Sequence, residues 1–242
     1  MAQETYTIVT DEAKLKEFIA SLPDSHNKDL VYYVCLFARS KYLSEDNKNS
    51  ITHIKSDKAQ LKRFVATKAT LLTKIKQLEC PLGSYMQYKT NVPDNPVPQE
   101  SLALYMTINP RSLKKATKNS AKKFLDMLLD NPGCPFNPSK FAMSEIQRSR
   151  GRTDYIVFDL DSKVHAKDWL RGKLKEIVGC GDGQFRILET RGGYHILVNP
   201  DGLKGNWFNK VQQVLGLDLD QCGDIMIPVP GTHQGGWTPR FV

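Results

Sequence analysis

The chain has 242 residues, 40% hydrophobic and 25% charged, which excludes wholesale disorder and predicts a folded protein of one large or two small domains. Its 34 Lys and Arg against 26 Asp and Glu give a formal net charge of +8, which favours an anionic partner such as nucleic acid, although a solvated basic surface has the same composition. We expect no export signal or membrane span, since no apolar segment follows basic residues at the N-terminus and no run of about 18 apolar residues occurs.

Residues 1–78 are predicted to form a small helical accessory region. Asp11 is placed to cap a first helix in AKLKEFIASL, and the apolar run LVYYVCLFARSKYL predicts a second helical segment. After a polar break, a long basic helix is expected from Lys58 to about Leu78.

The composition changes at Cys80 and Pro81, so we place a second domain at residues 79–242. SYMQYKT and SLALYMTINP are predicted strands, and KKATKNSAKKFLDMLL is predicted to be a helix with a lysine-rich face. A proline-containing loop is expected at 132–138.

The last third of the chain alternates strands and helices. In chain order the expected elements are the strand in TDYIVFDLDS, the helix HAKDWLRGKLKEIVG, the strands FRILET and YHILVNP around the turn RGG, the helix NWFNKVQQVLG and the strand DIMIPV. This order predicts an α+β protein whose sheet carries helices on one face.

Asp159 and Asp161 lie two residues apart at the end of the expected strand YIVFDLD, so their side chains share one face, about 6.5 to 7 Å apart. Two such carboxylates repel each other unless a cation neutralises them, and oxygen ligands suit Mg²⁺ or Mn²⁺ better than zinc. Two metal ions bridged there would hold a triphosphate. A lone DxD is unspecific, since it also occurs in glycosyltransferases and at exposed strand ends.

The segment from Thr190 to His195 lies between two expected strands. Gly192 and Gly193 expose backbone N–H groups and allow a ligand to approach closely, Arg191 offers donors suited to phosphate, and His195 is placed to donate to a phosphate oxygen. A hairpin turn with an incidental arginine and a packed histidine is the alternative.

Asp224 begins the expected strand DIMIPV and is the candidate for a third carboxylate on the same sheet face, ahead of Asp218 and Asp220, which precede the turn. The tail at 230–237 gathers three glycines and His233, a composition that suits a nucleotide-binding edge. A flexible C-terminal turn is the alternative.

Taken in order, VFDLD, ETRGGYHILV and GDIMIPVPGTHQGG resemble the three motifs of the archaeo-eukaryotic primase, or primase-polymerase, superfamily, over about 153–242. The first and third motifs imply that the catalytic metal ligands are Asp159, Asp161 and Asp224. The second motif and the PGT-H-G segment of small phage- and plasmid-type members imply nucleotide-binding roles for Thr190, Arg191, Gly192, Gly193, His195 and His233. Many members have serine where this chain has Thr190.

The resemblance implies a primase-polymerase-like catalytic module with an RNA-recognition-motif-like sheet, which makes or extends primers in DNA replication. The expected cofactor is Mg²⁺ or Mn²⁺, and the expected partners are a DNA template, an NTP or dNTP and a replicative helicase, in the cytoplasm of a bacterium or phage-infected host. A 3′-hydroxyl would attack the α-phosphate of the triphosphate and release pyrophosphate. Arg148, Arg150 and Arg152 are candidates to follow the template backbone.

Two other functions fit the same residues. A metal-dependent nuclease or replication initiator would also use acidic residues, a histidine and a basic surface. An inert single-strand-binding accessory protein would keep the fold without the chemistry.

Overall fold

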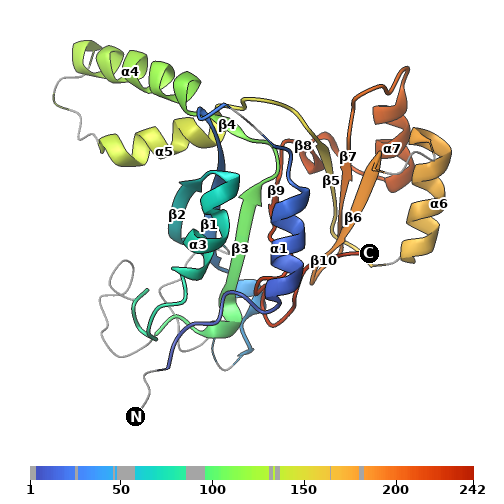
Figure 1. Ribbon diagram of the computed structural model, residues 1–242, viewed down its shortest axis with the longest axis horizontal. Helices are drawn as coiled ribbons and strands as arrows, with labels where there is room; N and C mark the ends of the chain where they lie inside the picture. Colours follow the sequence, from blue (N-terminus) through green and yellow to red (C-terminus); the bar gives the residue numbers. More distant parts are fainter. Residues whose placement is uncertain are drawn as a thin grey trace.

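The computed structural model describes residues 4–24, 27–45, 47, 58–85, 96–130, 133, 137–163, 165–179 and 183–242. Figure 1 shows two β-sheets side by side, with a pair of helices projecting from one end of the molecule. The α-helices are α1 (Glu12–Ser21), α3 (Lys68–Lys76), α4 (Leu113–Asp130), α5 (Pro138–Arg148), α6 (Lys167–Val178) and α7 (Trp207–Leu215). The strands are β1 (Leu30–Ala38), β2 (Ala59–Ala66), β3 (Leu102–Thr107), β4 (Arg111–Ser112), β5 (Ile156–Leu160), β6 (Phe185–Glu189), β7 (Tyr194–Val198), β8 (Cys222–Gly223), β9 (Met226–Pro228) and β10 (Arg240–Phe241). The short 3₁₀ helices are η1 (Ser40–Tyr42), η3 (Gln99–Ser101) and η4 (Leu219–Gln221). These elements confirm the predicted α+β class.

The first sheet has the strand order β2-β1-β3-β9, with β4 paired to the start of β1, and its neighbouring strands run antiparallel. The helical prediction for LVYYVCLFARSKYL is wrong, because its first nine residues form β1 at the centre of this sheet. Nearly all of β1 is buried, so its sequence is a continuous apolar run without the two-residue alternation of a half-exposed strand. Its β-branched and aromatic residues favour a strand.

The long basic helix expected from Lys58 to Leu78 is wrong in its first half. Residues Ala59–Ala66 form β2 at the edge of the sheet, where charged side chains reach solvent and discourage pairing with other chains. Helix α3 begins only after Thr67, whose backbone N–H donates to Thr70 Oγ1 at 3.1 Å in a capping box.

The boundary placed between residues 78 and 79 divides one sheet. Strands β1 and β2 precede it, β3 and β9 follow it, and the core of this sheet combines Leu36 and Leu71 with Leu104. The described part of 1–78 is therefore not a separate helical unit. The Asp11 cap is confirmed, since its side chain accepts from the Lys14 N–H at 3.0 Å.

The second sheet has the order β10-β6-β7-β5-β8 and is also antiparallel. The strands and helices predicted between 153 and 216 are confirmed. Alternate residues face opposite ways, since Phe158 and Ile196 pack in the cluster under α6 and α7, whereas Val157 and Leu197 pack in the cluster of α1 and the first sheet. One face of the second sheet is thus directed toward the first sheet.

Helices α4 and α5 form the projecting pair in Figure 1. The prediction of α4 is confirmed, whereas α5 was not predicted and begins at Pro138, the last residue of the expected loop. Asn137 caps α5 by accepting from the Lys140 N–H at 2.9 Å, and Pro138 lies in the first turn, where its missing N–H costs nothing.

Two further predictions concern the segment SYMQYKT and the C-terminal tail. Most of the strand predicted for SYMQYKT lies outside the described residues. The C-terminal tail ends in β10, which pairs with β6 and brings Phe241 against the core. None of the described helices has both the length and the apolar character needed to cross a lipid bilayer.

Candidate functional site

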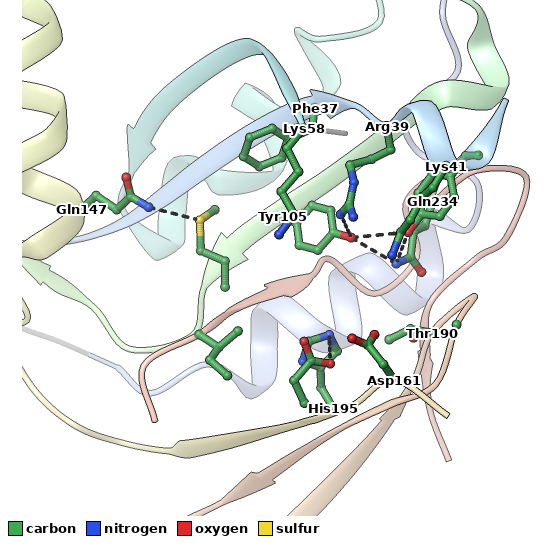
Figure 2. A pocket seen from close by; sticks show the side chains of 15 residues that line it. Phe37, Arg39, Lys41, Lys58, Tyr105, Gln147, Asp161, Thr190, His195 and Gln234 are labelled. Carbon is green, nitrogen blue, oxygen red and sulfur yellow. Dashed lines mark hydrogen bonds and ion pairs between the residues drawn. The ribbon is translucent and has the colours of Figure 1, made fainter. Parts of the chain in front are cut away.

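A cleft of about 360 Å³ opens between the two sheets, with side chains from both facing it (Figure 2). It is lined by Phe37, Arg39, Lys41, Tyr42, Lys58, Tyr105, Gln147, Asp159, Asp161, Thr190, Gly192, His195, Ile225, Met226 and Gln234. The sequence motifs therefore supply one wall of the cleft, and residues that precede the motif-bearing part of the chain supply the other.

Asp159 and Asp161 both line the cleft because they continue the face of β5 that carries Val157. Burial raises the pKa of Asp159 to about 6, and the negative charge of Asp161 adds to the rise. Lys41, Lys58 and Arg39 oppose this rise without cancelling it. Without a bound cation, ionised Asp159 is thus under-compensated, which is the electrostatic condition of a cation site.

His195 lies opposite Asp159 on the neighbouring strand β7, with its Nε2 3.5 Å from Asp159 Oδ1. Burial lowers the pKa of His195 to about 4, so the imidazole is neutral at neutral pH and the contact is not an ion pair. Its buried Nδ1 has no hydrogen-bond partner in the described part of the chain. The N–H of the neutral ring is best placed on Nε2, facing the cleft.

Three cations lie across the cleft from the carboxylates, as Figure 2 shows. Arg39 follows β1 and is buried, and its guanidinium donates to Tyr105 Oη at 3.0 Å. Lys41 lies in η1 and Lys58 just before β2, and both are exposed. This arrangement places three positive charges opposite a carboxylate pair across one cleft, and such cations can bind an anionic group.

The turn after β6 lines the cleft with Thr190 and Gly192 rather than with the side chain of Arg191. Thr190 is buried, with its Oγ1 3.1 Å from both the N and the O of Gly193, and Gly192 lines the cleft. The Arg191 guanidinium lies over the Tyr42 ring, 4.7 Å from its centroid, rather than in the cleft lining.

Gly193 is needed for a close backbone approach. A Cβ at this position would lie 1.9 Å from the carbonyl oxygen of Leu160 and 2.7 Å from the backbone N of Ser162, the two neighbours of Asp161. A Cβ on Gly192 would meet nothing within 4 Å. The second glycine therefore lets the turn pack against the backbone that carries Asp161.

Gln234 joins the two walls of the cleft. It lies in the predicted tail at 230–237 but was not itself predicted as a site residue. Its Nε2 donates to Tyr42 Oη at 3.1 Å, and its Oε1 accepts from the Arg191 N–H at 3.0 Å. His233, which was predicted, is not among the lining residues. Its Nε2 accepts from the Gly236 N–H at 3.1 Å, which stabilises the turn of the tail.

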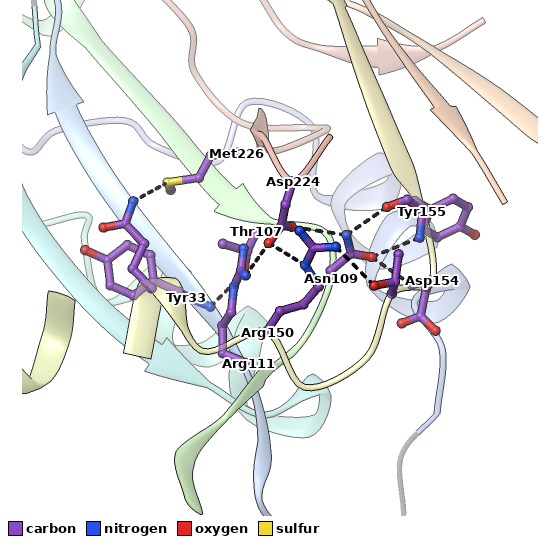
Figure 3. A network of polar contacts seen from close by, with 11 residues as sticks. Tyr33, Thr107, Asn109, Arg111, Arg150, Asp154, Tyr155, Asp224 and Met226 are labelled. Atoms are coloured by element: carbon purple, nitrogen blue, oxygen red, sulfur yellow. Dashed lines mark hydrogen bonds and ion pairs between the residues drawn. The ribbon is translucent and has the colours of Figure 1, made fainter. Parts of the chain in front are cut away.

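The structure places Asp224 apart from Asp159 and Asp161, in the crossing from β8 in the second sheet to β9 in the first. The expectation that it begins the strand DIMIPV is wrong, since β9 starts at Met226. Asp224 accepts from Arg111, from Arg150 at 3.0 Å and from Asn109 at 3.1 Å (Figure 3).

The partners of Asp224 tie the two sheets together. Asn109 also donates to Tyr155 O at 2.8 Å and accepts from the N–H groups of Asp154 and Tyr155, just before β5. Burial by itself raises the pKa of Asp224, but the hydrogen bonds and charges of Arg111, Asn109 and Arg150 outweigh it, so the pKa lies below its usual value. The geometry favours a structural role for Asp224 over a metal ligand.

We expect Asp224→Asn to destabilise the fold by about 2 to 4 kcal/mol, because it leaves the buried Arg111 guanidinium without its counter-charge. Chemical denaturation measures this effect, with the exposed Asp220→Asn as the matched control. The Mn²⁺ concentration needed for half-maximal metal binding should not change. If Asp224→Asn has normal stability but binds Mn²⁺ less tightly, Asp224 is a metal ligand and not a structural partner of Arg111.

Within the described residues, no group of three His, Cys, Asp or Glu side chains stands close enough to hold a metal ion. A divalent cation placed on Asp159 and Asp161 would have to complete its coordination with water or with oxygen atoms of a bound ligand, as Mg²⁺ commonly does.

The residues that the sequence missed are Arg39, Lys41, Lys58, Tyr42, Tyr105 and Gln234. A correct assignment of β1 and β2 as strands would have drawn attention to the cations at their ends. No local signal marks Tyr105. Gln234 lies in the tail at 230–237 that was predicted as a nucleotide-binding edge, but its contacts with Tyr42 and Arg191 depend on packing between distant parts of the chain. Comparison of the chain with protein-family models, with curated proteins and with solved structures gave no match.

Proposed function

We propose that this protein is a template-directed nucleotidyltransferase of the primase-polymerase kind, which makes or extends primers on DNA with Mg²⁺ or Mn²⁺. The observation that carries the proposal is the opposition of Asp159 and Asp161 to Arg39, Lys41 and Lys58 across one cleft. The residues and order of the first two sequence motifs support it independently, whereas the third motif does so without the metal-ligand role expected for Asp224.

The two ends of a metal-bound triphosphate have complementary partners in this cleft. Asp159 and Asp161 would hold the cation, which supplies charge neutralisation at the reacting phosphate and lowers the pKa of the attacking hydroxyl. Arg39, Lys41 and Lys58 would bind the phosphate oxygens. Phosphoryl transfer depends mainly on this positioning and charge stabilisation.

His195 and the turn at 190–193 complete the proposed nucleotide site. The imidazole would donate its Nε2–H to a phosphate oxygen, and it can do so in its neutral form. Thr190 and Gly192 would shape the same edge through the backbone. Arg191 would act by stacking on Tyr42, which orients a side chain of the opposite wall.

The test is an extension assay with a labelled primer on a DNA template, Mg²⁺ or Mn²⁺, and either dNTPs or NTPs. We expect the primer to lengthen by template-directed addition, and a parallel reaction without primer to report initiation. Shortened products would identify a nuclease instead. Retention of the DNA without any change in length would identify an accessory binding protein.

A further inference from the structure

The α4–α5 hairpin is built to project rather than to fill the core. Of the 18 residues of α4, only Ala116 is buried. The two helices pack on each other and are joined by an ion pair of 2.8 Å between Lys123 and the buried Glu145. A helix that buries so little gains little stability from tertiary packing, so its length calls for another reason.

The base of the hairpin is nevertheless firmly fixed to the body. Asp29 accepts from Ser112 Oγ at 2.6 Å and from the Lys114 N–H, and Ser112 Oγ accepts from the Lys115 N–H at 3.0 Å. The Ser112 N–H donates to Ser149 O at 2.8 Å, which closes the two ends of the hairpin. The first turns of α4 are therefore held in a defined position relative to the cleft.

Four lysines of α4, which we name the lysine face, lie on one side of the helix. They are Lys114, Lys115, Lys118 and Lys122. At 100° per residue they fall within an arc of about 100°, and they extend over about 12 Å of the helix axis. All four are exposed, and within the described residues none of them forms an ion pair.

The arginines expected to follow a template have a different situation. Arg150 pairs with Asp224 at 3.0 Å, Arg152 with Asp154 at 2.6 Å, and Arg148 lies 3.8 Å from Glu145. Asp224 and Glu145 also serve Arg111 and Lys123, so the charges of Arg150 and Arg148 are only partly compensated. Unlike these arginines, the lysines of the lysine face have no carboxylate partner within the described residues.

A second pocket of about 380 Å³ lies between the cleft and this hairpin. It is lined by Thr107, Arg111, Gln147, Arg148, Asp224 and Met226, and both Gln147 and Met226 also line the cleft. Helix α4 begins directly after Arg111 and Ser112. A chain leaving the cleft through this pocket thus arrives at the base of α4.

We propose that the α4–α5 hairpin is a nucleic-acid-binding arm whose lysine face holds the phosphate backbone of a strand running from the cleft. About 12 Å of α4 spans roughly three to four phosphates at ~3.4 Å per nucleotide of a duplex strand, which matches four lysines. The direction of the strand rests on the proposed function, whereas binding by the arm does not.

The test uses the full chain with all four lysines of the face changed to Gln, which keeps the helix propensity high. The matched control changes Lys167, Lys175, Lys204 and Lys210 to Gln. These are also exposed and lie at the α6–α7 end, opposite the arm in Figure 1. Both variants lose the same charge, so long-range electrostatics cannot distinguish them.

Fluorescence anisotropy with a labelled single-stranded oligodeoxynucleotide and with its duplex, across a KCl series, gives affinity and salt dependence. We expect the arm variant to bind at least one of them roughly 100-fold more weakly, with the slope of log K against log salt smaller by about 3. The control should lose no more than about threefold. The probe that loses more shows whether the arm holds a single strand or a duplex.

Unchanged affinity and slope in the arm variant would overturn the proposal, and so would equal losses in the arm and control variants. The same titration in Asp161→Asn separates this question from catalysis, because binding by the arm does not require the metal site. If the protein binds DNA through the lysine face but extends no primer, the nucleic-acid-binding role of the arm is supported and the polymerase proposal is contradicted.

Discussion

Asp161→Asn is expected to reduce metal-dependent nucleotide addition by roughly 10³-fold while leaving the protein folded. Asp161 is exposed and faces Asp159 on the same side of the strand, so its removal relieves a repulsion and breaks no packing. Mn²⁺ binding measured by calorimetry should weaken in parallel with activity. The exposed Asp201→Asn serves as the control and should retain both properties.

The pH dependence of the same site has a definite sign. Since Asp159 has a raised pKa of about 6, protons compete with the metal below that value, and Mn²⁺ affinity of the wild-type protein should rise as pH increases through about 6. Without metal, the folded state binds this proton more tightly than the unfolded chain. The contribution of Asp159 to the free energy of unfolding therefore decreases as pH rises from about 4 to about 6. Full activity of folded Asp161→Asn would contradict the proposal that Asp159 and Asp161 bind the metal. Mn²⁺ affinity that does not change with pH across this range would also contradict it.

Gly193→Ala is expected to lower both stability and activity, because its methyl group would overlap the Leu160 carbonyl group. The backbone has to shift by more than 1 Å to restore van der Waals contact, which we expect to cost about 3 kcal/mol. The shift displaces the residues on either side of Asp161, and a misplacement of about 1 Å is expected to reduce the rate of catalysis about 100-fold.

Gly192→Ala is the matched control for this prediction, since a Cβ there meets nothing within 4 Å. Its unfolding free energy should stay within about 0.5 kcal/mol of wild type. Thermal and urea denaturation of the two variants measure the difference. Equal stability of the two variants would show that the turn and the strand end do not depend on this close approach.

The sequence by itself determined the half of the protein in which contacts are local. The two-residue alternation of β5 put Asp159 and Asp161 on one face, and the pair of glycines between β6 and β7 fixed a hairpin that pairs His195 with Leu188. These relations follow from strand geometry and from antiparallel pairing of neighbouring segments, and they need no knowledge of the rest of the chain. The position of His195 opposite Asp159 depends in addition on the pairing of β7 with β5, which α6 and β6 separate in the sequence.

Only the tertiary structure decided the first half and the composition of the opposite wall. Strand β1 is covered on both faces, so its sequence has no period from which a strand could be distinguished from a buried helix. Once it is placed as a strand, Arg39 and Lys41 at its end face the carboxylates from more than 100 residues away in sequence.

The role of Asp224 also could not be decided from the sequence alone. Its position after a turn and before an apolar segment was compatible with a metal ligand or a structural partner, because a carboxylate suits both. The decision depends on Asn109, Arg111 and Arg150, which the folding of β3, β4 and the end of α5 brings to one point. A local sequence pattern specifies which chemical groups are present, whereas long-range packing determines which charge each group faces.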